Sequence, residues 1–332
     1  MKRARFVGAV GATSIAAAGA TRIAAAADAG APVTSAEYWA RKGDVKLFVY
    51  RKRVLAAASG APQPVLFLVH GSSMGGPTTF DLSVPGHDDY SMMDAFARRG
   101  FDVWTMDHEG YGRSDRTSGN SDIASGIADL HAAMGVVRGE TGATSAHFFG
   151  ESSGGIRAAA FAVEHPDAVR RLALSAFTWT GEGSPTLANR AKDVDFYRTH
   201  NRRPAPIELY RSIFTRDKPG TADPAVADAL YAAESKYGDS VPTGTYLDMV
   251  TKLPIVDPAH VRVPVLLARG EYDGISTEAD LIGFFERLAN RDKQYVVVPG
   301  SAHSLVLGYD RALLWHALHA FLTPPPRVDR VT

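Results

Sequence analysis

One serine stands in a sequence context that is typical of an enzyme nucleophile. Residues 150–154 read Gly-Glu-Ser-Ser-Gly, a Gly-x-Ser-x-Gly pattern centred on Ser152, with a β-rich run before it (145–149) and a helix-prone run after it (156–164). Where a strand turns sharply into a helix, the middle residue must hold a strained backbone conformation, and the flanking glycines leave room for the chain. Such an elbow would expose the Ser152 hydroxyl and direct the Ser153 amide, at the helix N-terminus, toward developing negative charge. The rival interpretation is a chance occurrence of the pattern in a glycine-rich chain.

The elements that would position this serine alternate between strands and helices. A stripe of apolar residues at steps of four and three predicts a helix packed on a sheet: Ile123, Ile127, Leu130, Met134 and Val137. Further helices are predicted at 90–99 and 313–322, and the predicted strands cover 44–54, 65–69, 101–106, 172–177, 265–268 and 295–298. This alternation implies an α/β fold with a mostly parallel central sheet flanked by helices on both faces.

The alternation is interrupted between residues 178 and 262. This segment is rich in Tyr, Phe, Arg and Pro, has helical pieces such as 225–237, and contains no strong buried strand. We predict a lid or cap inserted between two parts of the core, 28–177 and 263–332, where substrate-selecting residues of such enzymes usually lie. Its aromatic residues would either line a pocket or pack the small core of the lid itself: Trp179, Phe196, Tyr197, Tyr210, Phe214, Tyr231 and Tyr246.

Composition excludes several other classes of function. The 332 residues carry a formal net charge of zero, so nothing indicates a nucleic-acid partner or a polybasic membrane contact. There is no cysteine, which excludes disulfides, thiolate zinc sites and a cysteine nucleophile. We expect no metal and no cofactor, since His316 and His319 have no further ligands nearby in sequence and no nucleotide-binding glycine loop is found. The oligomeric state is left open.

The N-terminus predicts an export signal. Lys2, Arg3 and Arg5 form a positive start, residues 6–20 carry no charge, and small residues precede Asp28. The segment 1–27 is too short and too rich in alanine for a transmembrane helix, so we predict a periplasmic or secreted protein without an integral membrane span. The run that begins at Arg3 resembles a twin-arginine leader, although the two arginines are not adjacent. The alternatives are an ordinary alanine-rich helix and a disordered tail.

From about Lys46 onward, the sequence resembles the α/β-hydrolase superfamily. Five landmarks stand in the order that the superfamily shows: an oxyanion loop at 70–76, an Asp-x-x-Gly-x-Gly-x-Ser turn at 107–114, the elbow at Ser152, an acid loop at 269–274 and a histidine loop at 299–304. The resemblance implies an α/β-hydrolase fold. Within the superfamily, the turn and the Gly-Gly after the elbow are loosely similar to monoacylglycerol lipases and lysophospholipases.

The resemblance also implies a role for each residue of a Ser-Asp-His triad. His303 would be the base that takes the proton of Ser152, and Asp273 would hold the imidazole in the correct tautomer. The backbone N–H groups of Ser72 and Ser153 would form the oxyanion hole. Glu271 and Asp280 are rivals of Asp273. Among the 11 histidines, His70 is expected to be a hydrogen-bonding brace and His108 to shape its loop.

These features favour an exported serine hydrolase that cleaves a carboxylic ester of a small or medium-sized substrate through an acyl-enzyme. Amidase, lactonase and thioesterase activities use the same triad and stay open. A hydrolase-fold protein that binds a small molecule with little turnover is the non-enzymatic alternative. The serine at the elbow argues against the epoxide hydrolases and haloalkane dehalogenases of the superfamily, whose nucleophile is an aspartate.

Overall fold

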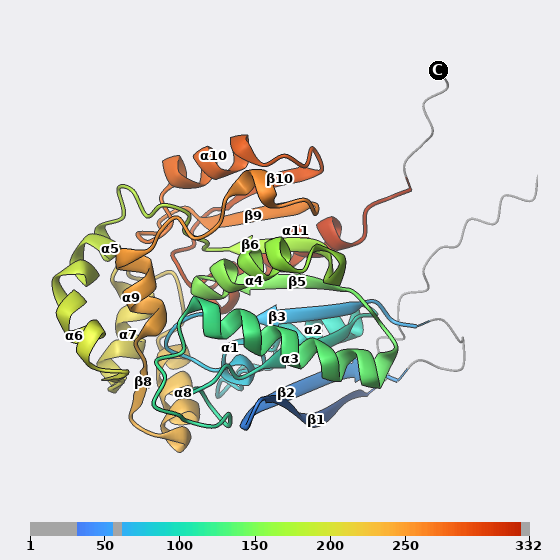
Figure 1. Cartoon of the computed structure of the whole chain (residues 1–332), viewed down its shortest axis with the longest axis horizontal. Helices are drawn as coiled ribbons and strands as arrows, with labels where there is room; N and C mark the ends of the chain where they lie inside the picture. The colour runs from blue at the N-terminus through green and yellow to red at the C-terminus, as the bar shows by residue number, and fades with distance from the viewer. Residues whose placement is uncertain (1–31, 56–61, 327–332) are drawn as a thin grey trace, which may run out of the picture.

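A central sheet of eight strands organises the chain, and it runs in the order β1-β2-β4-β3-β5-β6-β9-β10 (Figure 1). The computed structural model describes residues 32–55 and 62–326, so the predicted export signal at 1–27 lies outside the described residues. The strands of this sheet are β1 (Val33–Lys42), β2 (Val45–Val54), β3 (Val65–Val69), β4 (Asp102–Met106), β5 (Ala146–Glu151), β6 (Val169–Ser175), β9 (Val265–Gly270) and β10 (Lys293–Val298).

Neighbouring strands from β4 to β10 are parallel, whereas β2 runs antiparallel to both β1 and β4. The mostly parallel α/β sheet predicted from the sequence is therefore confirmed. The sequence pattern did not predict β1, because this edge strand alternates polar and apolar residues and buries only Ala40 fully. An edge strand with one solvated face lacks the continuous apolar run of a buried strand.

Helices cover both faces of the sheet, and the side chains of β3 show how the faces divide. Leu66 and Leu68 join one apolar cluster, whereas Val65, Phe67 and Val69 join the other. On the Leu66 face lie α1 (Gly76–Phe80), α2 (Met92–Arg98) and α11 (Arg311–Leu322); on the opposite face lie α3 (Ile123–Thr141), α4 (Ser153–Glu164) and α10 (Glu278–Arg287). All five residues of the predicted apolar stripe on α3 are buried.

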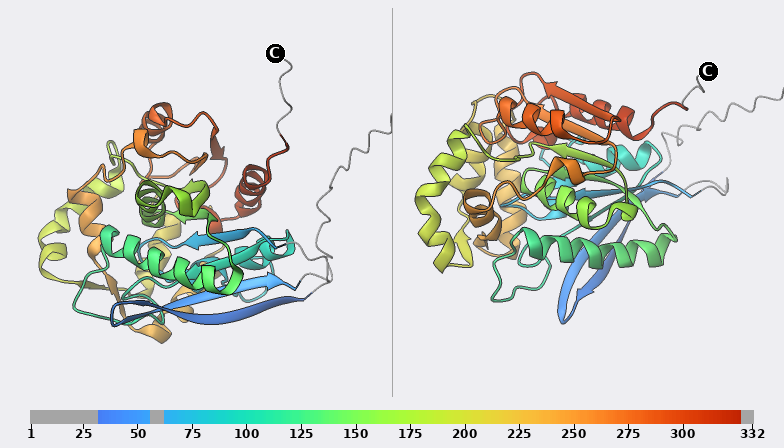
Figure 2. Two further views of the ribbon diagram at one scale, coloured as in Figure 1. Left: turned by 45° about the vertical axis from the view of Figure 1, so that its right-hand side comes forward. Right: turned by 45° about the horizontal axis from the view of Figure 1, so that its top comes forward.

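Extra helices are inserted between β6 and β9, as predicted. Figure 1 shows them gathered at one end of the sheet, and the two views of Figure 2 show the same grouping. The inserted elements are α5 (Pro185–Arg190), α6 (Val194–Thr199), α7 (Ile207–Thr215), α8 (Pro224–Glu234), α9 (Gly244–Thr251) and a two-stranded sheet of β7 (Arg202–Pro204) and β8 (Ser240–Pro242). Short 3-10 turns complete the described chain: Pro166–Ala168, Ala191–Asp193, Ser235–Tyr237, Pro258–His260 and Leu305–Leu307.

The elements of the described chain include no membrane-spanning candidate. Among residues 32–55 and 62–326, no helix combines the length and the apolar character that crossing a bilayer requires.

Candidate active site

Three loops at the carboxyl ends of parallel strands bring Ser152, Asp273 and His303 together. Nε2 of His303 lies 2.9 Å from Oγ of Ser152, and Nδ1 of the same ring lies 2.9 Å from Oδ1 of Asp273. The Asp273 and His303 side chains are buried, and Ser152 is partly exposed. This is the hydrogen-bonded arrangement in which a histidine can take the proton of a serine while a carboxylate orients the ring.

The backbone at Ser152 has the strained conformation expected of an elbow. Its φ is 57° and its ψ is −126°, a left-handed region that non-glycine residues rarely adopt. The turn requires a close approach of other backbone segments at both glycines. A Cβ atom at Gly150 would lie 2.5 Å from the carbonyl oxygen of Gly154, and one at Gly154 would overlap the carbonyl oxygens of Val69 and His70.

The carboxylate of Asp273 is held in its charged form. Burial alone would raise its pKa, but the charge and hydrogen bond of His303 and the amides of Ser276 and Ile275 outweigh burial and lower the pKa. Those two amides donate to Oδ1 at 3.0 and 2.8 Å. The rival carboxylates act elsewhere: Glu271 accepts a hydrogen bond from the Gly300 amide, and Asp280 accepts from amides at 179–181.

The two residues predicted to form an oxyanion hole lie next to each other. Oγ of Ser72 is 2.8 Å from Oγ of Ser153 and 2.7 Å from Oγ1 of Thr245 on the inserted helix α9. These side-chain bonds fix the loop after β3 against the first turn of α4. Neither the Ser72 amide nor the Ser153 amide donates a hydrogen bond to another part of the described chain, and Ser72 lines the cavity beside Ser152. The position of Ser153 at a helix N-terminus favours negative charge there.

Two buried histidines support the loops around the serine. Nε2 of His70 accepts a 3.1 Å hydrogen bond from the His108 amide, and its Nδ1 lies 2.8 Å from the Gly71 carbonyl oxygen. Nδ1 of His108 lies 3.1 Å from a carboxylate oxygen of Asp129. Burial lowers the pKa of both rings well below the usual histidine value. The predicted bracing role of His70 is therefore confirmed.

A carboxyl group from the inserted helices also reaches the loop after β3, and no pattern in the sequence predicted this contact. Oε1 of Glu234, on α8, accepts a 2.7 Å hydrogen bond from the Gly75 amide and also contacts the Thr78 hydroxyl. Nearby, Oδ1 of Asp107 accepts from the Gly76 amide at 2.8 Å. Burial raises the pKa of Glu234 to about 7 and that of Asp107 to about 6.

The cavity beside Ser152 is small, about 40 Å3, and no aromatic residue of the insertion lines it. The inserted segment contributes Arg190, Ile213 and Arg216 to its wall. None of the seven aromatic candidates lines this cavity. Four of them are buried in the core (Tyr197, Tyr210, Phe214 and Tyr246), which agrees with the alternative that they pack the insertion itself.

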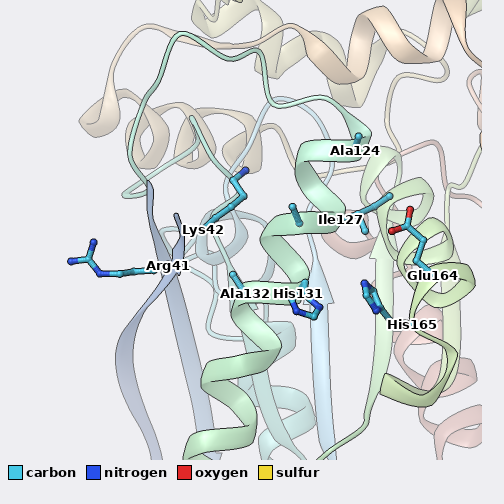
Figure 3. Close-up of a pocket in the computed structure, with 9 residues that line it drawn as sticks. Arg41, Lys42, Ala124, Ile127, His131, Ala132, Glu164 and His165 are labelled. Carbon is cyan, nitrogen blue, oxygen red and sulfur yellow. The ribbon is translucent and has the colours of Figure 1, made fainter. Parts of the chain in front are cut away.

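A second hollow lies away from Ser152, and no serine, threonine or cysteine is among the residues that line it. Figure 3 shows this groove, of about 520 Å3, between the end of β1 and the helices α3 and α4. His131 and His165 face it, with their ring centres 4.9 Å apart, beside Glu164. No three His, Cys, Asp or Glu side chains within the described ranges are grouped so as to hold a metal ion.

Comparison with known families gives a match over most of the chain. Residues 88–310 match the family described as "Serine aminopeptidase, S33". The matched range contains all three residues of the Ser152, Asp273 and His303 cluster.

A curated relative shares a shorter region. A 2-hydroxy-6-oxononadienedioate/2-hydroxy-6-oxononatrienedioate hydrolase from Paraburkholderia phymatum is 32% identical over 135 residues. This alignment covers 39% of the present chain and 40% of the relative, so the chain spans well under half the length of the curated protein it matches.

Solved structures share the whole architecture at low sequence identity. The enol-lactonase from Burkholderia xenovorans superimposes with a TM-score of 0.63 at 18% identity, covering 86% of this chain and 100% of that one. A malate-bound thermophilic esterase from Thermogutta terrifontis gives a TM-score of 0.62 at 18% identity, with coverage of 87% and 98%. These likenesses confirm the predicted α/β-hydrolase fold with inserted helices.

Proposed function

Because the chain belongs to the serine aminopeptidase S33 family of α/β-hydrolases, we propose that it cleaves a carboxylic ester of a small substrate through an acyl-enzyme on Ser152. The observation that carries this proposal is the continuous hydrogen-bonded series from Ser152 through His303 to Asp273. The small cavity at Ser152 favours a short acyl group.

In the proposed mechanism, His303 takes the hydroxyl proton through Nε2 as Oγ of Ser152 attacks the ester carbonyl carbon. Asp273 keeps the proton of the ring on Nδ1 and stabilises the imidazolium that forms. His303 then returns the proton to the departing alkoxide. A water molecule, activated by the same ring, releases the acid and restores Ser152.

The negative charge of the tetrahedral intermediate would be held by the amides of Ser72 and Ser153. Both amides are free of protein acceptors in the described chain, and the second one adds the field of the α4 N-terminus. Loss of one such donor costs about 3 kcal/mol in the transition state.

A second candidate function is hydrolysis of a 2-hydroxy-6-oxo dienedioate. The observation that favours it is the 32% identity to a hydrolase named for such substrates. The same triad could serve this reaction, as it could serve a lactonase, an amidase or a thioesterase, because the fold does not by itself determine the reaction.

The discriminating experiment compares two kinds of substrate. One is a series of methyl and nitrophenyl esters of increasing acyl length, and the other is a 2-hydroxy-6-oxo dienedioate, whose turnover is measured as a loss of absorbance. We expect ester turnover that disappears in Ser152→Ala and peaks at short acyl chains. Turnover of the dienedioate alone would replace the ester proposal with the second candidate. Tight binding without turnover of any substrate would favour a small-molecule binding protein.

We also propose that the protein is exported. The charge and apolar pattern of residues 1–27 supports this proposal. N-terminal sequencing of the protein recovered from the periplasm or medium should give a chain that begins at Asp28. Retention of residues 1–27 in a cytoplasmic protein would contradict it.

A further inference from the structure

Two arginines of the inserted helices line the cavity that contains Ser152 and His303. Arg190 is the last residue of α5, and Arg216 directly follows α7. The guanidinium of Arg190 lies over the ring of Tyr246, 4.9 Å from its centre, and its Nη1 is buried without a hydrogen-bond acceptor among the described residues. Arg190 as a whole is partly exposed, but a guanidinium N–H that is buried without an acceptor is costly unless a partner binds it.

The charges around Arg190 do not provide that partner. The charged groups that act on it most strongly include two further guanidiniums, Arg216 and Arg203, and no carboxylate. Burial lowers the pKa of Arg190 to about 10, so the group is still a cation at neutral pH. Arg216 forms an ion pair with Asp217, with 3.4 Å between Nε and Oδ1, but this contact lacks hydrogen-bond geometry and leaves Nε without an acceptor among the described residues.

The one carboxyl group that lines this cavity does not neutralise the arginines either. Burial raises the pKa of Glu151 to about 8, and the charge of Asp273 adds to this effect. Glu151 is therefore protonated at neutral pH. The wall of the cavity thus carries two guanidiniums, of which Arg216 is ion-paired with Asp217, and the one carboxyl group in the wall is neutral.

We propose that Arg190 and Arg216 bind a carboxylate of the substrate, so that the preferred substrate is a half-ester of a short dicarboxylic acid. This inference rests on the proposed ester hydrolysis at Ser152. A guanidinium presents a planar fork of donors that matches a carboxylate, and both Arg190 and Arg216 line the cavity beside Ser152. The small size of the cavity restricts the spacer between the two carboxyl groups to a few carbons.

The test compares monomethyl succinate and monomethyl glutarate with methyl butanoate and methyl pentanoate, in which a methyl group replaces the free carboxylate. Acid release is followed in a pH-stat. We expect the wild-type protein to show a higher kcat/KM for at least one half-ester than for its neutral counterpart. In Arg190→Gln and Arg216→Gln, kcat/KM for that half-ester should fall roughly 10- to 100-fold, mainly through KM, because a charged hydrogen bond is lost. In the same variants, kcat/KM for the neutral esters should change less than about threefold.

Arg203→Gln is the matched control, because Arg203 also lies over Tyr246 at 4.9 Å but does not line the cavity. We expect this variant to keep the half-ester preference. An equal loss on both kinds of ester in Arg190→Gln, or a wild-type protein that prefers neutral esters, would overturn the inference while leaving ester hydrolysis intact.

Binding to Ser152→Ala separates this inference from the proposed function. Isothermal titration with monomethyl succinate should show binding that is lost in the Ser152→Ala, Arg190→Gln double variant, and methyl butanoate, which has no free carboxylate, should bind at least tenfold more weakly. This result without ester turnover in the wild-type protein would reject the ester proposal and retain the anion site. Equal binding of monomethyl succinate and methyl butanoate, or of monomethyl succinate and inorganic phosphate, would overturn the carboxylate assignment.

Discussion

Glu234 joins the inserted helices to the loop that carries Ser72, because its Oε1 accepts a 2.7 Å hydrogen bond from the amide of Gly75. Glu234 is buried at the end of α8, and Gly75 follows β3 more than 150 residues earlier in the chain. The geometry of the loop at Ser72 therefore depends on a residue of the insertion.

This contact predicts a pH-dependent stability. Burial raises the pKa of Glu234 from 4.5 to about 7, so between these pH values the folded protein holds a proton that the unfolded chain has released. Stability from this group is then highest at acid pH and is lost as the pH rises toward 7. We expect Glu234→Gln to gain free energy of unfolding relative to wild type from pH 5 to pH 8, by at most about 3 kcal/mol.

Urea unfolding of both proteins at a series of pH values measures this difference. Glu140→Gln, which removes an exposed carboxylate from α3, controls for the change in net charge. If the free energies of unfolding of wild type and Glu234→Gln differ by the same amount at every pH, the prediction is contradicted.

The elbow predicts opposite effects for two glycine-to-alanine changes in helices. A Cβ at Gly154 would overlap the carbonyl oxygens of Val69 and His70, whereas a Cβ at Gly135, on the exposed side of α3, has no neighbour within 4 Å. Gly154→Ala should lower stability by about 1–3 kcal/mol and abolish activity. Gly135→Ala should raise stability by about 0.5–1 kcal/mol with activity unchanged. Thermal unfolding measures the stability of both variants, and ester turnover measures their activity. A Gly154→Ala variant that is both stable and active would contradict the close backbone packing at the elbow.

The raised pKa of Glu151 predicts that the rate of ester hydrolysis falls at alkaline pH. Its pKa is raised to about 8 by burial and by Asp273, so above pH 8 a negative charge forms beside Ser152, where the intermediate also becomes negative. For a neutral ester, kcat/KM of the wild type should fall several-fold between pH 8 and pH 10. Glu151→Gln should remove most of this fall. The same decline in both proteins would assign the limb to another group.

The assignment of Asp273 as the carboxylate of the triad predicts that substitutions of Asp273 and of its neighbour Glu271 affect activity differently. Asp273→Asn keeps the shape of the side chain but removes the charge that holds His303, so kcat should fall by roughly 10²- to 10⁴-fold. Glu271→Gln should retain activity within a few-fold, because Glu271 interacts with the Gly300 amide and the Tyr272 hydroxyl rather than with a residue of the triad. Steady-state kinetics on one ester measures both, and a larger loss in Glu271→Gln would reverse the assignment.

Local signals made much of the fold predictable from the sequence. The elbow at Ser152 is encoded by adjacent residues, and the buried strands are continuous apolar runs, so each could be found within a short window. The edge strand β1 escaped prediction because a half-solvated strand has no such run. The approach of His303 and Asp273 to Ser152 was inferred only by resemblance, since loops that are far apart in the sequence carry no local sign of meeting.

The residues that line the cavity beside Ser152 could not be predicted from the sequence, for a related physical reason. Nothing near Arg190 or Arg216 in the sequence says whether the side chain points to solvent or to Ser152, because that depends on how the inserted helices pack. The aromatic residues of the insertion were expected either to line the pocket or to pack the insertion, and four of the seven are buried in the core. Glu234 was missed in the same way.

The most direct test of the central claim is the mass of the intermediate. Wild-type protein mixed with an excess of a nitrophenyl ester and quenched in acid within milliseconds to seconds should carry one acyl group, and peptide mapping should place it on Ser152. Ser152→Ala should carry none. Turnover of the ester with no acyl group on the protein, or with the acyl group on another residue, would contradict the account.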